Sequence, residues 1–196
     1  MTTKKIFILL GHPDKETRTG SFADAYERGA RAGGHEVRRM NIGDMVFDPI
    51  LHKGYKVVQP YEPDLVTAQE NILWCDDFII FYPSWWSTMP ALLKGFFDRA
   101  WMPRFAFSFK KEGFMAGMFW RRLLKGRRAH VYISSDSHPF FSHILFGDHS
   151  REIKRCILSF AGFSSHVTKV GPLKFANEAR LDKWRTKMEK WGRSGY

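Results

Sequence analysis

Apolar residues along this chain gather in short runs that alternate with longer amphipathic segments. Five runs of β-forming residues predict strands at residues 4–10, 35–42, 78–82, 129–134 and 165–170. Apolar residues recur at helical spacing over residues 22–32, 64–75, 90–101, 150–162 and 177–191. This alternation predicts parallel strands joined by right-handed crossovers, with helices on both faces of one sheet.

The pattern favours an α/β fold of the flavodoxin-like, doubly wound type, with five parallel strands in the order 2-1-3-4-5. Ligands of such sheets bind beyond the carboxyl ends of the strands, near the point where the strand order reverses. The loops at residues 11–21, 83–89 and 135–148 should therefore meet at one edge. Because no internal repeat or linker interrupts the pattern, we expect a single domain over residues 1–196.

The loop after the third predicted strand is the most distinctive segment. Pro83 ends the strand, since proline cannot donate to the ladder, and Pro90 suits the first turn of the next helix. Between them lie Trp85, Trp86 and the hydroxyls of residues 87–88, which can offer a planar ligand apolar faces and hydrogen bonds. The alternative is that these tryptophans only cover the core.

The loop after the first strand has the composition of a phosphate site. It ends at the start of a helix, where unpaired N–H groups and a partial positive charge attract anions. Thr17, Thr19 and Ser21 supply hydroxyls, while His12 and Arg18 can add positive charge. Taken alone, Ser21 is explained equally well as a plain helix cap.

Composition narrows the classes of partner. Hydrophobic residues make up 44% of the 196 residues, enough for a substantial core, and the net charge is +11. The basic residues are scattered and no nucleic-acid-reading motif is present, so we expect anionic small ligands and no nucleic acid. No apolar run approaches the ~18 residues of a membrane span, and the apolar run near the N-terminus is too short for a signal peptide.

The sequence gives little support for a cysteine site, a metal site or another common catalytic motif. The two cysteines, Cys75 and Cys156, read as helix-face packing residues, so we expect no disulfide, no nucleophilic thiol and a cytoplasmic setting. The neighbours Asp148 and His149 are too few for a metal site, and we expect none. A Walker loop, a dinucleotide fingerprint and a serine-hydrolase elbow are all absent from the sequence. A phosphate cradle beside an aromatic loop remains, and this combination suits flavin mononucleotide (FMN).

Several segments together resemble the flavodoxin-fold NAD(P)H:quinone oxidoreductases, the family of DT-diaphorase and the small bacterial quinone reductases. The resemblance extends to about Leu173 and rests on the order and spacing of its pieces. They are residues 11–12 with 21–22, residues 83–99, residues 105–109, residues 123–129 and residues 157–163.

The resemblance implies a flavin, FMN rather than FAD, and NAD(P)H as co-substrate. It also implies a homodimer whose aromatic segment at residues 105–109 lines the pocket of the partner subunit. The residues it assigns to the cofactor are His12, Thr19, Ser21, Phe22, Pro83, Ser84, Trp85, Trp86, Ser87, Ser134 and Ser135. The expected substrate pocket contains Phe107, Phe109, Phe140 and Phe146.

The loop after the fourth strand departs from this family. Members carry a tyrosine and a histidine beside the flavin, and the alignment places Phe140 and Phe146 at those positions. Phenylalanine cannot donate a proton, so His138, His143 or His149 is expected to substitute as the catalytic group.

The resemblance thus implies an NAD(P)H-dependent flavin enzyme. Two electrons pass as a hydride through the flavin N5, in ping-pong order, to a quinone or similar aromatic acceptor. A flavin-binding regulatory subunit with little turnover is the alternative.

Overall fold

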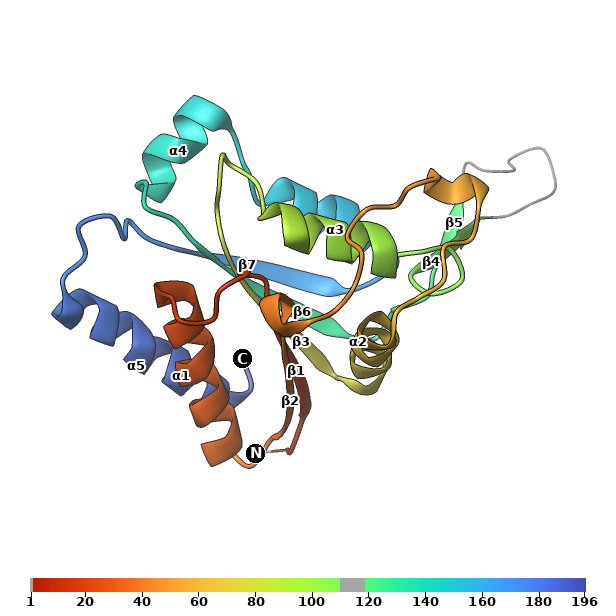
Figure 1. Cartoon of the computed structure of the whole chain (residues 1–196). Helices are drawn as coiled ribbons and strands as arrows, with labels where there is room; N and C mark the ends of the chain where they lie inside the picture. Colours follow the sequence, from red (N-terminus) through yellow and green to blue (C-terminus); the bar gives the residue numbers. More distant parts are fainter. Residues whose placement is uncertain (1, 110–118) are drawn as a thin grey trace.

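A computed structural model describes residues 2–109 and 119–196. Its centre is a parallel sheet of five strands in the order β2-β1-β3-β6-β7 (Figure 1). The strands are β1 (Lys5–Leu10), β2 (Glu36–Asn41), β3 (Asp77–Pro83), β6 (Arg128–Ser134) and β7 (Ser164–Val170). This arrangement is consistent with the expected flavodoxin-like α/β fold. The strand numbering differs from 2-1-3-4-5 because two further strands, β4 and β5, precede β6 in the chain.

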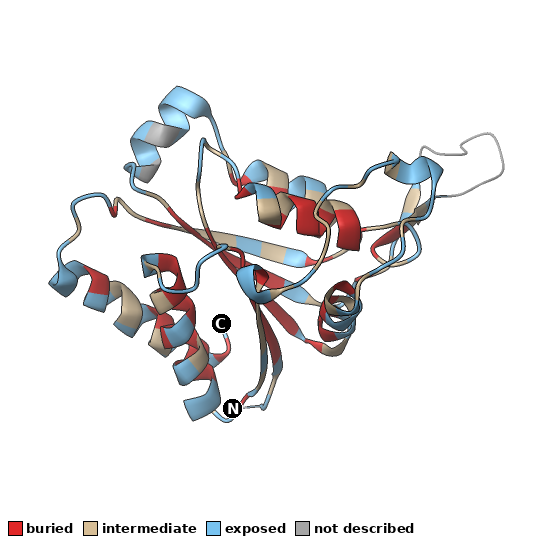
Figure 2. Cartoon of the chain, viewed as in Figure 1, coloured by how far each residue is buried: buried red, intermediate tan, exposed pale blue. Residues whose placement is uncertain are grey.

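Helices cover both faces of the sheet because the central strands are apolar on both sides. Ile6, Ile8 and Leu10 of β1 pack with α1 (Arg18–Ala32) and α5 (Glu178–Ser194). Phe7 and Leu9 point the other way, toward α2 (Pro63–Trp74), α3 (Ala91–Ala100) and the π-helical η3 (Glu152–Ser159). Figure 2 shows this continuous buried centre. The alternation follows from the two-residue period of a strand.

Helix α1 begins at Arg18, four residues before the expected start at Phe22. Thr17 is its cap, because the threonine side chain accepts a hydrogen bond from the Gly20 N–H. Gly20 is required for close packing, since a Cβ there would lie 1.9 Å from the Lys15 carbonyl oxygen. The segment that was expected to lead into the helix is therefore its first turn.

The remaining elements lie outside the main sheet. The short strands β4 (Phe107–Phe109) and β5 (Trp120–Arg122) pair antiparallel, and 3-10 turns η1 (Ile42–Asp44) and η2 (Gly54–Lys56) follow β2. Helix α4 (Pro139–Phe146) occupies a stretch expected to be loop, and it projects from the body in Figure 1. Part of the aromatic-rich stretch 101–120 lies outside the described residues. Within the described ranges, no helix is both long and apolar enough to cross a bilayer.

The segment at residues 46–62, here called the strap, is anchored by a buried arginine of α3. Arg99 is 1% exposed and donates hydrogen bonds to Glu62 Oε2 at 2.8 Å, to the Pro60 carbonyl at 2.7 Å and to the Asp48 carbonyl. Burial raises the pKa of Glu62, but hydrogen bonds from the Asp48 N–H and from Arg99 hold that pKa below its usual value. Arg99, near the C-terminal end of α3, thus holds the strap against the helix.

Replacing Arg99 with methionine should cost about 2–4 kcal/mol of unfolding free energy, because it leaves two carbonyls and a carboxylate without their partner. Lys94→Met on the same helix is the control, since the Lys94–Asp98 ion pair is about half exposed and should be worth under ~1 kcal/mol. Urea unfolding of both variants measures the difference. Equal losses would show that Arg99 does not hold the strap.

Candidate functional site

Two adjoining cavities lie at the carboxyl edge of the sheet, between the loops that follow β1, β3 and β6. The first-loop cavity, about 310 Å³, is lined by His12, Thr17, Arg18, Thr19, Pro83, Ser84, Trp85, Ser134, Ser135, Asp136 and Leu173. The third-loop cavity, about 490 Å³, is lined by Ser84, Trp86, Ser87, Ser135, Ser137, Phe146 and His149. They share Ser84 and Ser135, so they form one continuous candidate site.

The first turn of α1 forms one wall of the first-loop cavity. The first N–H groups of a helix have no intrahelical partner, so this wall can bind an anion. Arg18 Nη1 donates to the Leu173 carbonyl at 2.7 Å, which ties the turn to the chain after β7. The buried Thr19 hydroxyl lies 2.7 Å from the Ser134 hydroxyl at the end of β6. These contacts draw three segments together around the first-loop cavity.

A tight turn separates the two cavities. Trp85 and Thr88 exchange backbone hydrogen bonds of 2.9 and 3.0 Å, and Trp86 and Ser87 between them have positive φ of 50° and 62°. Two positive φ values are the pattern of a type I′ turn, which normally uses asparagine and glycine. Trp85 lies edge-on to His12, with ring centroids 5.3 Å apart, and Trp86 is fully exposed.

The three candidate catalytic histidines are placed very differently. His149 lines the third-loop cavity, and both of its ring nitrogens are buried without a hydrogen-bond partner among the described residues. Burial, and then the nearby Lys169, lower the pKa of His149 below its ordinary value. His138 caps α4, accepting from the Phe140 N–H at 3.3 Å, and His143 is exposed on that helix. Geometry therefore singles out His149.

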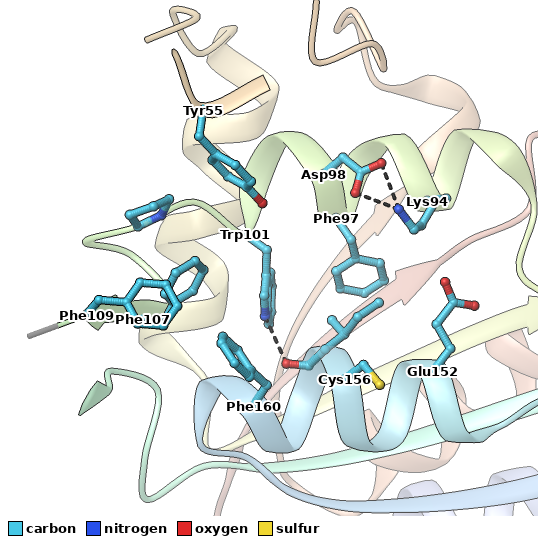
Figure 3. Close-up of a pocket in the computed structure, with 12 residues that line it drawn as sticks. Tyr55, Lys94, Phe97, Asp98, Trp101, Phe107, Phe109, Glu152, Cys156 and Phe160 are labelled. Atoms are coloured by element: carbon cyan, nitrogen blue, oxygen red, sulfur yellow. Dashed lines mark hydrogen bonds and ion pairs between the residues drawn. The ribbon is translucent and has the colours of Figure 1, made fainter. Parts of the chain in front are cut away.

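The four phenylalanines expected in one substrate pocket do not meet in this chain. Phe146 lines the third-loop cavity, while Phe140 is exposed on α4. Phe107 and Phe109 line a different cavity of about 600 Å³ between α3, η3 and β4. Figure 3 shows that cavity, with Trp101 at its centre donating from Nε1 to the Ile157 carbonyl at 3.1 Å. A single chain thus divides the expected pocket into separate parts.

Two expected cofactor residues lie behind the first-loop cavity. Phe22 is buried in the core under α1, and the Ser21 hydroxyl donates to the Arg18 carbonyl at 2.8 Å. Neither lines the cavity. Thr17 and Arg18 do so instead, because the helix begins one turn earlier than its apolar spacing indicated. Asp136 lies in the loop that was expected at this edge, whereas Leu173 had no sequence signal, since only folding brings it here.

The described ranges contain neither a reactive-cysteine site nor a metal site. Cys75 is buried, and burial raises the pKa of its thiol to about 12, whereas Cys156 is exposed on η3 and is not a packing residue. Residues 2–109 and 119–196 contain no group of three or more side chains arranged to hold a metal ion.

Comparison with known proteins identifies the family. A family model described as flavodoxin-like fold matches residues 4–191. The chain belongs to this family. An uncharacterized NAD(P)H oxidoreductase of Escherichia coli is 26% identical over 106 residues, which cover 52% of this chain and 54% of that protein. The chain spans about half the length of several curated relatives that it matches.

Solved structures share the fold over almost the whole chain. An NAD(P)H:quinone oxidoreductase from Methanothermobacter marburgensis has a TM-score of 0.80 at 20% identity, with all of both chains covered. An FMN-dependent NADH-azoreductase from Bacillus anthracis, solved with FMN, has a TM-score of 0.70 at 15% identity and covers 98% of this chain and 99% of its own. At these identities the likeness establishes the fold alone.

Proposed function

We propose that this family member is a flavin-dependent NAD(P)H oxidoreductase that reduces a quinone or a similar aromatic acceptor. The observation that carries the proposal is the junction of the two cavities at Ser84 and Ser135, with a helix N-terminus on one side and tryptophans on the other. Several relatives are named NAD(P)H oxidoreductases or quinone dehydrogenases, which supports an enzyme over a regulatory subunit. The catalytic unit proposed is one domain over residues 1–196, in a cytoplasmic setting.

The residues at the edge of the sheet suit a flavin mononucleotide. In this proposal, the first turn of α1 and Arg18 bind the phosphate, while Thr19, Ser134 and Ser135 offer hydroxyls to the ribityl chain. Trp85, Trp86 and the backbone of residues 83–87 frame the ring, and Ser21 and Phe22 support the helix from behind. A bound flavin supplies hydride transfer between NAD(P)H and the acceptor. FMN is favoured because the first-loop cavity offers one helix N-terminus for one phosphate.

His149 is the group proposed to manage charge beside the ring. Its lowered pKa keeps the imidazole neutral at pH 7, so one ring nitrogen can donate a hydrogen bond while the other accepts. Both nitrogens are buried without a partner among the described residues, so the imidazole has to turn before it can offer one of them to a ligand in the third-loop cavity. In this proposal His149 takes the role of the family's tyrosine and histidine, whose positions are occupied here by Phe140 and Phe146.

Arg18→Glu should weaken FMN binding by ~10–100-fold, because it removes a charge-assisted hydrogen bond and places a carboxylate against the phosphate. Arg28→Glu, an identical charge change on an exposed position of the same helix, is the matched control and should leave affinity nearly unchanged. Titration of apoprotein with FMN, followed by fluorescence, gives both dissociation constants. Equal weakening in the two variants would assign the effect to overall charge and not to the cavity.

His149→Ala should slow flavin reduction by NAD(P)H by about 10²-fold in single turnover, within the usual range for general acid–base groups. His143→Ala, on the exposed helix, should change the rate by less than about twofold. Flavin content measured on each variant separates lost chemistry from lost cofactor. A full rate in His149→Ala would remove the histidine from the mechanism.

We also propose that the enzyme is a homodimer formed over the cavity in Figure 3. Phe97, Trp101, Phe107 and Phe160 give that cavity apolar walls, and Tyr55 of the strap stands exposed beside it. A second copy that covers these walls would remove a large apolar surface from water. It would also supply the half of the substrate pocket that one chain keeps apart from Phe146.

Analytical ultracentrifugation at micromolar concentration should therefore give twice the chain mass. Phe109→Asp should shift the protein toward the monomer, because a charge would be buried at the interface. The control is Phe175→Asp, an aromatic on the β7–α5 loop that is 91% exposed, against 47% for Phe109. A flavin-loaded wild-type monomer would contradict the proposal.

A further inference from the structure

The turn at residues 85–88, which separates the two cavities of the candidate site, receives little support from packing. Trp86 is fully exposed and Trp85 is 43% exposed. Trp86 and Ser87 have positive φ values, which residues other than glycine keep only where the surrounding structure holds them. Strand β3 and the buried Met89 fix the two ends of the turn, so polar contacts have to hold its tip.

One side chain from outside the loop makes such a contact. Glu152, the first residue of η3, accepts a hydrogen bond from the Thr88 hydroxyl at 2.8 Å. Thr88 is also the residue that exchanges two backbone hydrogen bonds with Trp85 across the turn. Within the described part of the chain, Thr88 is the only side chain hydrogen-bonded to Glu152. The contact thus ties the tip of the turn to η3.

Helix η3 gives Glu152 a fixed base. Ile153, the next residue, is completely buried in the core. Figure 3 shows the Glu152 side chain extending from η3 toward α3. Lys94 of α3 lines the same cavity, but it pairs with Asp98 at 2.7 Å. The Glu152 carboxylate is therefore left to the Thr88 hydroxyl.

We propose that Glu152 is a positioning residue of the flavin site, which acts through Thr88 to hold residues 85–88 in the form that frames the ring. The inference rests on the proposed function, because the flavin is the ligand that Trp85 and Trp86 would frame. Glu152 lines the cavity in Figure 3 and neither cavity of the candidate site, so it acts through the turn and not by touching the flavin. A charged acceptor makes a stronger hydrogen bond than a neutral one, which offsets part of the strain in the turn.

Titration of the full-length apoprotein with FMN tests the proposal. Glu152→Ala should weaken binding by ~5–10-fold, because the turn opens more readily without its acceptor. Glu152→Gln should stay within about threefold of the wild type, since an amide oxygen still accepts from Thr88. Glu70→Ala removes the same charge from an exposed position on α2 and should leave the affinity unchanged. Wild-type affinity in Glu152→Ala, or equal losses in the Ala and Gln variants, would overturn the proposal.

Thr88→Val removes the other half of the contact and should weaken FMN binding by a similar factor. Because both residues act through one bond, the double variant should bind no more weakly than either single variant. Losses that multiply would show that the two side chains act separately, and the proposal would be wrong. Thr88 does not line the cavity in Figure 3, so the comparison also tests the proposed dimer as the route. Loss of the dimer mass in Glu152→Ala, with normal FMN binding by Thr88→Val, would overturn the proposal.

Amide hydrogen exchange of the apoprotein supplies a readout that needs no flavin. The Trp85 and Thr88 N–H groups, which close the turn, should exchange at least ~5-fold faster in Glu152→Ala and return toward the wild-type rate in Glu152→Gln. Unchanged exchange would overturn the role of Glu152 even if the wild type binds FMN. A wild type that binds no flavin, but whose turn still responds to Glu152→Ala, would reject the proposed function and leave Glu152 with a structural contact alone. Matching thermal unfolding midpoints confirm that the variants are folded.

Discussion

The whole architecture depends on the burial of β1 and β3 on both faces. Ile6, Ile8 and Leu10 on one side and Phe7 and Leu9 on the other are completely buried, so helices must cover each face. Parallel strands with helical crossovers then end at the same edge. The candidate site is a consequence of this burial, because the loops begin at the carboxyl ends of neighbouring parallel strands and so start side by side.

Around that rigid sheet, polar contacts adjust the positions of the loops. The Thr19–Ser134 hydroxyl contact joins the first and third loops, and the reciprocal bonds of Trp85 and Thr88 close the turn between them. Far from this edge, Arg99 plays the corresponding role for the strap. Thr19, Ser134 and Arg99 are buried, so the loss of either of these two contacts would leave polar groups unpaired inside the protein.

In the candidate site, the sheet and the first two loops follow the expected pattern, whereas the third loop differs from it. Where the resemblance implied a tyrosine and a histidine, α4 places phenylalanines, and His149 enters the third-loop cavity from beyond the helix. The change makes this edge more apolar and leaves one face of α4 without a partner inside the described chain.

The sequence alone determined the alternation of strands and helices, the flavodoxin-like class and the three loops that form the site. Those features follow from local periodicity and from proline and glycine, which act over a few residues. The predicted start of α1 at Phe22 was about one turn too late, because the Thr17 cap and the approach of Gly20 to Lys15 outweigh apolar spacing. Only the tertiary structure selected His149 among three histidines, separated Phe107 from Phe146 and assigned Arg99 to the strap. Which side chains are buried, and which groups they contact, depends on residues far apart in the chain, and no local pattern encodes this.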